Sequence, residues 1–304
     1  MPRAVVIINP IAGPGRSRTL SSCVDVAKSV LSAYNYEPDI RITEGPQDAS
    51  RFSTEAVALG ADLVIAWGGD GTVNGAAAGV AGTNTAFAII PGGSGNGLAR
   101  DLLIPFDPTA AFTIAARGAT RAIDAGELHG SLFFNVAGIG FDARIADRLA
   151  QPGARRGLIG YIFATFGEIR GYKPGRYSID EVYDHEGKSL VADIVDRPAL
   201  FIALANSRQY GSGAQIAPRA LLDDGMIEIV IVEPQSGLSI ARQVPAFFRG
   251  TLKEGPGLVM RSAASMEISC EHPIYFHVDG EPRKGPNRIA LRTRRGVLSV
   301  KVAG

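Results

Sequence analysis

The sequence contains little cysteine and little histidine, the residues that disulfide frameworks and zinc sites require. Its two cysteines, Cys23 and Cys270, lie far apart in a chain of 304 residues and form no CxxC pair. We therefore expect reduced thiols and a cytoplasmic protein. The four histidines show no HExxH spacing, so a zinc site has no support.

The chain also lacks a strong net charge and a long apolar run. Lysine and arginine number 31 and aspartate and glutamate 30, so no overall field attracts nucleic acid and we predict no nucleic-acid partner. No stretch approaches the roughly 20 apolar residues of a membrane-spanning helix. We expect a soluble protein, with a peripheral position at a membrane as the alternative.

Two common phosphate-binding motifs are missing as well. Neither GxxxxGK[ST] nor GxGxxG occurs, which disfavours a P-loop NTPase and an ordinary dinucleotide-binding fold. The segment GGSGN resembles the hydrolase motif GxSxG, but Asn96 stands where the second glycine belongs. Ser94 is therefore interpreted as a phosphate contact or as a plain turn serine, and not as a nucleophile.

The first hundred residues do contain a repeated pattern, in which a short apolar run is followed by a glycine-rich segment. Val5–Ile8, Leu63–Trp67 and Phe87–Ile90 are apolar runs, and each leads into a glycine-rich segment. Helical patterns separate the runs, which predicts a doubly wound α/β domain with buried parallel strands. Ligands bind beyond the carboxyl ends of such strands. Three glycine-rich segments at these ends predict a phosphate-bearing ligand.

The pattern changes to short strands after about residue 122. We predict an α/β domain over 1–122 and a β-sandwich over 123–304, with the last residues of the chain allowed to return to the first domain. The segment RIALRTRRGVLSVKV is predicted as a hairpin about Arg295–Gly296. Helices are expected at Ile145–Leu149, Gly157–Ile169 and Leu238–Phe248.

Acidic residues in three turns are candidates for phosphoryl-transfer chemistry, which needs a phosphate cradle, a divalent ion and a base. Asp70 follows a strand among glycines, and we expect it to be open to an ion. Asp279 and Glu281 flank a glycine in HVDGEP, where an acidic β-turn is the alternative interpretation. The segment DDGM, around Asp224, is either a turn before a strand or a cation loop.

Taken together, these segments resemble the soluble diacylglycerol kinase family, which includes bacterial lipid kinases and the sphingosine and ceramide kinases. The matching segments run in family order from residue 8 to 282: INPIAGPGRS, ITEGPQDA, GGDGTVNGAAAG, IIPGGSGNGLAR, FNVAGIGFDA, APRALLDDGMIEI and VDGEP. The resemblance implies ATP-dependent, magnesium-dependent phosphorylation of a lipid hydroxyl at a membrane surface. It also implies that ATP binds between an α/β domain and a β-sandwich.

The resemblance also implies roles for individual residues. Glu281 falls at the proton acceptor, beside Asp279, and Asp70 at the essential carboxylate of the nucleotide loop; which of Glu281 and Asp70 is the effective base stays open. Asp142 falls at a lipid-contacting aspartate, and Arg155 or Arg156 near phosphate-binding arginines. The metal site would use Asp224 and the carbonyls of Leu221 and Met226. The positions implied for ATP binding are Asn9, Pro10, Ile11, Ala12, Gly13, Thr43, Gly68, Gly69, Asp70, Gly71, Thr72, Val73, Asn74, Ser94 and Asn96.

Departures from the family pattern leave the acceptor open. Gly75 stands where many members have glutamate, and GSGNGLAR is closer to sphingosine kinases than to bacterial diacylglycerol kinases. Diacylglycerol and a sphingosine- or ceramide-like lipid are both retained. An NAD kinase shares GGDGT, but a TGSTAY-like segment is missing; a catalytically silent relative is disfavoured because the carboxylates are present. A homodimer is left open.

Overall fold

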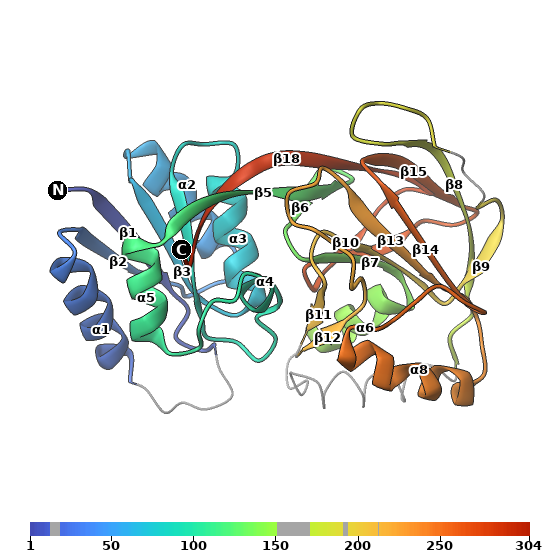
Figure 1. Cartoon of the computed structure of the whole chain (residues 1–304), viewed down its shortest axis with the longest axis horizontal. Helices are drawn as coiled ribbons and strands as arrows, with labels where there is room; N and C mark the ends of the chain where they lie inside the picture. Colours follow the sequence, from blue (N-terminus) through green and yellow to red (C-terminus); the bar gives the residue numbers. More distant parts are fainter. Residues whose placement is uncertain (13–18, 151–170, 191–193, 212) are drawn as a thin grey trace. The chain divides into compact units, whose positions relative to one another are not determined.

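The structure, a computed structural model, describes residues 1–12, 19–150, 171–190, 194–211 and 213–304. The chain divides into two compact units, which we describe separately (Figure 1). Unit 1 comprises Met1–Ile123 and Gly296–Gly304, and unit 2 comprises Asp124–Arg295. The end of the chain thus belongs to the first unit.

Unit 1 is a parallel sheet with helices between its strands. Its sheet has the order β2-β1-β3-β4, and the end of β18 joins β4 in parallel, with Val300 opposite Phe87. The strands are β1 (Arg3–Ile8), β2 (Glu37–Ile42), β3 (Leu63–Gly68) and β4 (Ala86–Pro91). The helices are α1 (Leu20–Ala33), α2 (Asp48–Ala58), α3 (Asp70–Val80), α4 (Gly97–Asp101) and α5 (Pro108–Arg117).

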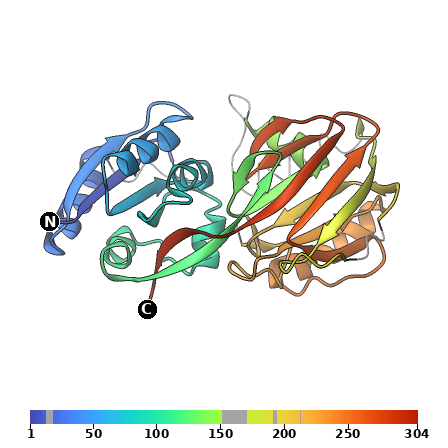
Figure 2. The ribbon, with the colours of Figure 1, turned by 90° about the horizontal axis from the view of Figure 1, so that it is seen from above.

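The sequence explains why these elements form here. All six residues of β3 are buried, as expected for a strand covered on both faces. Thr19 caps α1 by accepting the Ser22 N–H at 3.3 Å. Strand order and right-handed crossovers place α1 on one face of the sheet and α2 with α3 on the other, and α1 packs against α5 while α2 packs against α3 (Figures 1 and 2). The carboxyl ends of β1 to β4 therefore share one edge.

Unit 2 is a sandwich of two mainly antiparallel sheets. One has the order β14-β13-β10-β7-β16-β17; the other is formed by β18, β15, β8 and β9, with β5 and β6 beside β18. The first contains β14 (Leu258–Ala263), β13 (Ile227–Val232), β10 (Phe201–Ala205), β7 (Val136–Gly140), β16 (Tyr275–Val278) and β17 (Glu281–Lys284). The second contains β18 (Arg288–Val302), β15 (Ser265–Cys270), β8 (Gly175–Tyr183), β9 (Arg197–Ala199), β5 (Ala119–Leu128) and β6 (Ser131–Phe133).

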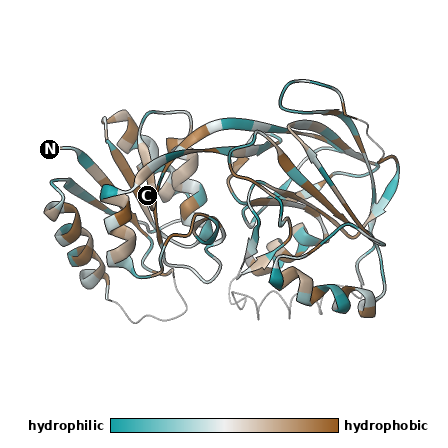
Figure 3. Cartoon of the chain, in the orientation of Figure 1, coloured by the Kyte–Doolittle hydropathy of each residue, from teal (hydrophilic) through white to brown (hydrophobic). Residues whose placement is uncertain are grey.

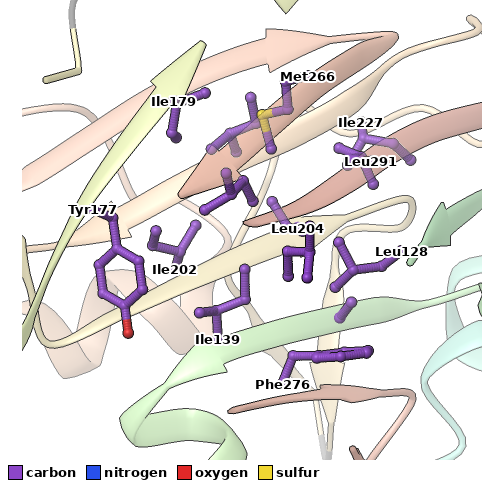
Figure 4. Packing of buried hydrophobic residues seen from close by; sticks show 14 of the residues in the cluster. Leu128, Ile139, Tyr177, Ile179, Ile202, Leu204, Ile227, Met266, Phe276 and Leu291 are labelled. Carbon is purple, nitrogen blue, oxygen red and sulfur yellow. The ribbon is translucent and has the colours of Figure 1, made fainter. Parts of the chain in front are cut away.

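The apolar core of unit 2 lies between these two sheets. Ile139, Ile202 and Phe276 come from the first sheet and Ile179 and Leu291 from the second, and all are at most 1% exposed (Figure 4). Because inward-facing residues alternate with outward-facing ones, the outer faces are left for other contacts. This core holds β7 and β16, and β17 pairs with β16; these strands carry the candidate site of unit 2.

Two helices and a small ribbon complete unit 2. These are α6 (Phe141–Ala150), α8 (Gly237–Arg249) and the pair β11 (Gln209–Gly211) with β12 (Ala214–Gln215). Apolar and polar residues follow one another along α8 (Figure 3), and its Phe247 ring lies 5.7 Å from the Tyr210 ring. In the part of the chain that the structure describes, no helix is both long enough and apolar enough to span a bilayer.

The predicted fold class is confirmed, but one predicted element is wrong. The expected hairpin about Arg295–Gly296 does not exist, because Arg288–Val302 forms a single strand, β18. Gly296 has φ +56°, so the glycine changes the course of one strand where we expected a turn. The expected helices at Ile145–Leu149 and Leu238–Phe248 lie in α6 and α8. The expected helix at Gly157–Ile169 lies outside the described residues.

Candidate active site

Asp70 joins the two glycine-rich loops of unit 1 that follow β3 and β4. It is the first residue of α3, and its carboxylate accepts the N–H groups of Asn96 at 2.9 Å and Gly97 at 2.7 Å. We expected a carboxylate open to an ion. The structure instead directs both oxygens of Asp70 to the start of α4, so the contacts it shows are those of a residue that holds the loops together.

The glycines near Asp70 permit backbone to pack directly on backbone. A Cβ on Gly93 would lie 2.5 Å from the Gly69 Cα, and a Cβ on Gly95 would lie 2.4 Å from Asp70 Oδ2. A Cβ on Gly68 would lie 2.6 Å from the Thr72 side chain. Any side chain at these three positions would push the loops apart. The result is an edge of backbone without side chains, beside the amino end of α3.

The segments after β1 and β2 join the same edge. Asn9 Nδ2 donates to Thr72 Oγ1 at 2.9 Å, while Asn9 Oδ1 accepts the Ile11 N–H at 3.1 Å. The Thr43 N–H donates to the carbonyl of Ile8 at 2.9 Å. These bonds confirm the predicted gathering of the polar segments at one edge. Gly13, also predicted to bind ATP, lies outside the described residues.

Other predicted nucleotide contacts differ in how accessible they are. Ser94 and Ile11 are exposed, but Val73 and Asn74 are buried in the first turns of α3. Asn96 is also buried, at φ +52°; its Oδ1 accepts the Gly93 N–H at 2.9 Å and its Nδ2 donates to the Gly93 carbonyl at 2.6 Å. Because both ends of its amide are bonded to Gly93, Asn96 shapes the loop. Its role in binding ATP remains a prediction.

In unit 2, Asp279 anchors the turn between β16 and β17. Asp279 and Gly280 have φ +47° and +87°, as in the type I′ turns that favour Asp-Gly. The Asp279 carboxylate accepts three backbone N–H groups, those of Phe134 at 2.8 Å, Asn135 at 3.0 Å and Val136 at 2.8 Å. A catalytic role for Asp279 stays a prediction, and these contacts favour a positioning role.

Glu281 directly follows this turn and begins β17. Its carboxylate lies 3.1 Å from Arg283 Nη2, and the Glu281 side chain is 47% exposed. Within the described residues, no backbone N–H is bonded to it. Of the three predicted catalytic carboxylates, Glu281 is therefore the one whose oxygens are not engaged by the backbone.

Asp142 lies in a buried pair, although we expected it to contact lipid. It is the second residue of α6 and is 3% exposed, and its Oδ2 is 2.6 Å from His277 Nε2. Burial alone lowers the pKa of His277, but the charge and hydrogen bond of Asp142 and the charge of Asp279 raise it more, so the net shift is upward. A lipid contact for Asp142 stays a prediction that this burial disfavours. Arg155 and Arg156 lie outside the described residues.

The predicted metal loop contains two neighbouring carboxylates. Burial raises the pKa of Asp224, and the nearby charges of Asp124 and Asp223 add to the shift. Asp124 is 2% exposed, and its Oδ2 accepts the Gly225 N–H at 2.6 Å. Asp224 Oδ1 accepts the Met226 N–H at 2.9 Å. A carboxylate whose charged form is disfavoured in this way, as that of Asp224 is, suits a divalent cation.

One neighbour of this loop favours a bound cation, and two other observations oppose it. Asn206 is fully buried and donates to the carbonyls of Asp124 and Phe134, while its Oδ1 has no partner among the described residues. This amide oxygen is a further possible oxygen ligand for a cation near Asp124. Arg295, however, packs against Gly225, and no cluster of three or more acidic, histidine or cysteine side chains occurs in the described ranges. A cation here would depend on backbone carbonyls, such as that of Leu221.

A cavity of about 810 Å³ opens within unit 2 beside α6 and β17. Its size is that of a small-molecule site. Burial raises the pKa of Tyr172 to about 12 and that of Tyr177 also upward, so both phenols keep their protons at neutral pH. Pro282, the residue after Glu281, is part of the wall. The basic side chains in the wall are Arg144, Arg148, Lys173, Arg283 and Lys284.

Three residues of these sites were not singled out from the sequence. Asp124 lies in a strand, Asn206 follows one, and His277 was interpreted as an ordinary surface or core histidine. The only signal for His277 is its place two residues before Asp279 in HVDGEP. Asp124 and Asn206 carry no local motif, because their partners lie about a hundred residues away in the chain.

Comparisons with known proteins assign both parts of the chain to known domain families. Residues 3–128 match the family described as diacylglycerol kinase catalytic domain, and residues 135–301 match the YegS C-terminal NAD kinase beta sandwich-like domain. A protein of Pectobacterium atrosepticum named "Probable lipid kinase YegS-like" is 33% identical over 254 residues, 81% of this chain and 80% of that protein.

Two further matches cover more of the chain. A diacylglycerol kinase of Mycobacterium tuberculosis is 29% identical over 288 residues, 92% of this chain and 88% of that protein. Among solved structures, that of a diacylglycerol kinase from Bacillus anthracis has a TM-score of 0.73 at 21% identity and covers 99% of this chain and 96% of that chain. At this identity the structural match speaks for the fold.

Proposed function

This chain belongs to the family that combines the diacylglycerol kinase catalytic domain with the YegS-type C-terminal domain, and from this membership we propose that it transfers the γ-phosphoryl group of ATP to a hydroxyl group of a lipid. It is thus a kinase. What we propose is the identity of its nucleotide, its metal ion and its lipid acceptor, and where each binds. The observation that carries the proposal is the glycine-rich edge of unit 1, where Asp70 bonds two loops together.

The nucleotide phosphates are assigned to this edge. Backbone N–H groups at the amino end of a helix bind anions because they are directed outward and the helix dipole is positive there. The amino end of α3 meets these conditions, with Gly69 and Gly93 packed closely enough to leave no side chains between the loops. Asn9 and Thr72, joined by a hydrogen bond, fix the neighbouring segment.

Glu281 is assigned as the general base. As the lipid oxygen bonds to the γ-phosphorus, the bond from that phosphorus to the bridging oxygen breaks, ADP leaves, and Glu281 takes the hydroxyl proton. A base needs an available oxygen lone pair. Among Asp70, Asp279 and Glu281, only Glu281 is without bonds from described backbone N–H groups.

Mg²⁺ is assigned to the loop of Asp224, with Asp124 beside it and carbonyls of Leu221 and Met226 as further ligands. The raised pKa of Asp224 supports this, because a cation would relieve the repulsion between the two carboxylates. A bound Mg²⁺ supplies positive charge and order to this loop. The acceptor lipid is assigned to the cavity that Tyr172 and Pro282 help to line.

Incubation with labelled ATP and Mg²⁺ tests the proposal. The acceptors are diacylglycerol, sphingosine, ceramide and NAD, each presented separately, the lipids in mixed micelles. We expect label in a lipid product, and none in NADP. Label in NADP alone would identify an NAD kinase, and no transfer to any acceptor would contradict the proposed function. Omission of Mg²⁺ and replacement of ATP by GTP test the metal and the nucleotide separately.

A further inference from the structure

Asp142 and His277 form a buried acidic–basic pair in the described part of unit 2 that the proposed chemistry does not use. Asp142 is 3% exposed and His277 is 6% exposed. The distance of 2.6 Å between Oδ2 and Nε2 is that of a strong hydrogen bond. Burying two such groups is costly unless each is bonded to the other and to further partners.

The strand beneath the pair is adapted to it. His277 in β16 is opposite Gly138 in the neighbouring strand β7. A Cβ on Gly138 would lie 1.9 Å from Asp142 Oδ2 and 2.4 Å from His277 Nε2. Only glycine leaves room for the contact, so the segment GIGFD supplies both the space, at Gly138, and the carboxylate, at Asp142.

The other ring nitrogen of His277 connects the pair to the turn that precedes Glu281. The Gly280 N–H donates to His277 Nδ1 at 3.2 Å. A nitrogen that accepts an N–H carries no proton, so the ring proton is on Nε2 and is donated to Asp142. The bond from Asp142 thus sets the tautomer that allows Nδ1 to accept from Gly280.

We propose that Asp142 and His277 are positioning residues that fix the backbone of Gly280 and thereby the place of Glu281. The inference rests on the proposed function, since it assumes that Glu281 is the base. Asp279 fixes the turn from one side through three N–H groups of Phe134–Val136, and His277 fixes it from the other. Gly280, at φ +87°, is otherwise the least restrained residue of the turn.

This role has a distinct kinetic consequence. A small displacement of a catalytic group reduces the rate of the chemical step far more than it weakens substrate binding. Loss of the His277 contact should therefore lower kcat and leave the KM of ATP and of the lipid nearly unchanged. If Asp142 contacted the lipid directly, its loss would raise the lipid KM.

Two substitutions of His277 separate its two bonds. In His277→Asn the amide oxygen can take the place of Nδ1 and accept from Gly280, whereas His277→Gln keeps the reach to Asp142 and loses Gly280. We expect kcat to fall about 30-fold or more in His277→Gln and less than about fivefold in His277→Asn, with both KM values within twofold. The exposed His129, changed to Asn, is the matched control and should leave kcat unchanged.

Hydrogen exchange of the Gly280 amide gives a readout that does not depend on activity. We expect faster exchange in His277→Gln and near-normal exchange in His277→Asn. Asp142→Asn keeps the shape of the pair and serves if a His277 variant does not fold; it should lower kcat about fivefold or more without raising the lipid KM.

Three outcomes would overturn the inference. These are a kcat of His277→Gln equal to that of wild type, a loss of kcat in His277→Asn as large as in His277→Gln, and a raised lipid KM in Asp142→Asn. If the wild type transfers phosphate to no lipid while Gly280 exchange responds as expected, the proposed function fails but the positioning contact stands. If Glu281→Gln is inactive and His277→Gln is fully active, the proposed function stands and the positioning role of His277 fails.

Discussion

The glycine-rich edge of unit 1 and the β16–β17 turn of unit 2 both hold an aspartate against backbone N–H groups. Asp70 accepts two such groups from the loop after β4, and Asp279 accepts three from the start of β7. In each case the carboxylate of an acidic turn holds neighbouring backbone in place. The difference lies in the next residues, because only unit 2 places a further carboxylate, Glu281, immediately after its anchored turn.

The comparison teaches that an acidic residue in a glycine turn is not by itself a base or a metal ligand. A carboxylate bonded to several N–H groups has its lone pairs engaged and stabilises the turn. Unit 1 uses such a turn to expose bare backbone, and unit 2 uses one to present a side chain.

Glu281→Gln should have the largest effect on activity and almost none on stability. Removal of a general base lowers kcat by about 10²- to 10⁴-fold, and the half-exposed side chain contributes little to folding. Steady-state kinetics and nucleotide titration check this, with the nucleotide Kd expected within twofold of wild type. Arg283→Ala is the control for loss of the ion pair and should keep kcat near wild type; because Arg283 also lines the cavity, a change in the lipid KM is allowed for this variant. A kcat within threefold of wild type for Glu281→Gln would remove Glu281 as the base.

Asp279→Ala and Asp70→Ala should destabilise one unit each. Loss of a carboxylate that accepts several N–H groups costs about 3 kcal/mol for Asp279 and somewhat less for Asp70, since fewer groups lose their partner. The only tryptophan, Trp67, lies in β3 of unit 1, so its fluorescence reports that unit, whereas far-UV circular dichroism reports both.

Urea denaturation followed by both signals separates the two variants. Asp70→Ala should shift the Trp67 transition, and Asp279→Ala should shift the circular dichroism transition while leaving the Trp67 transition in place. An equal shift of the Trp67 transition by both variants would show that the carboxylates do not serve separate units, and the comparison would fail.

Unit 1 was the more predictable of the two from sequence. Three of its strands, β1, β3 and β4, are short apolar runs that lead into glycine-rich segments, and parallel topology alone brings those ends together. The sequence could not predict which residues these glycines contact, because Gly93 in the loop after β4 packs on Gly69 in the loop after β3. We expected the glycines to expose Asp70, whereas they let one loop pack on the other.

Unit 2 could be predicted as a sandwich but not in its polar contacts. The bonds of Asp279 to β7 and of Asp142 to His277 join residues 135 or more positions apart, and no periodicity encodes such pairings. The hairpin at Arg295–Gly296 failed for a related reason. Arg-Gly between two apolar runs is typical of a turn, but β18 stays one strand and pairs with β15, β5 and β4.

Gly93→Ala should weaken nucleotide binding without affecting unit 2. The new Cβ would lie 2.5 Å from the Gly69 Cα, so the two loops must separate and the backbone edge loses its shape. We expect the KM of ATP to rise about tenfold, which is about 1.4 kcal/mol, with kcat and the lipid KM within threefold. Gly237→Ala, whose Cβ would meet open space, is the control. An unchanged KM of ATP would show that nucleotide binding does not use this edge.

Asp224→Asn should have the smallest effect, visible in stability and not in the fold. The pKa of Asp224 is raised by burial and by the charges of Asp124 and Asp223, so its contribution to stability is full below the ordinary aspartate pKa and is lost as the pH rises through the raised value. In EDTA, the free energy of unfolding of wild type should therefore decline over this window relative to that of Asp224→Asn. The asparagine keeps an oxygen for the Met226 N–H.

Added Mg²⁺ at neutral pH should stabilise wild type more than it stabilises Asp224→Asn. A cation bound only to the folded state raises the Tm, by a few degrees for a chain of this size, and the gain should be lost in Asp224→Asn but kept in Asp223→Asn, whose side chain is exposed. Differential scanning fluorimetry with and without EDTA measures it. An equal gain in Asp224→Asn and wild type would place the ion elsewhere.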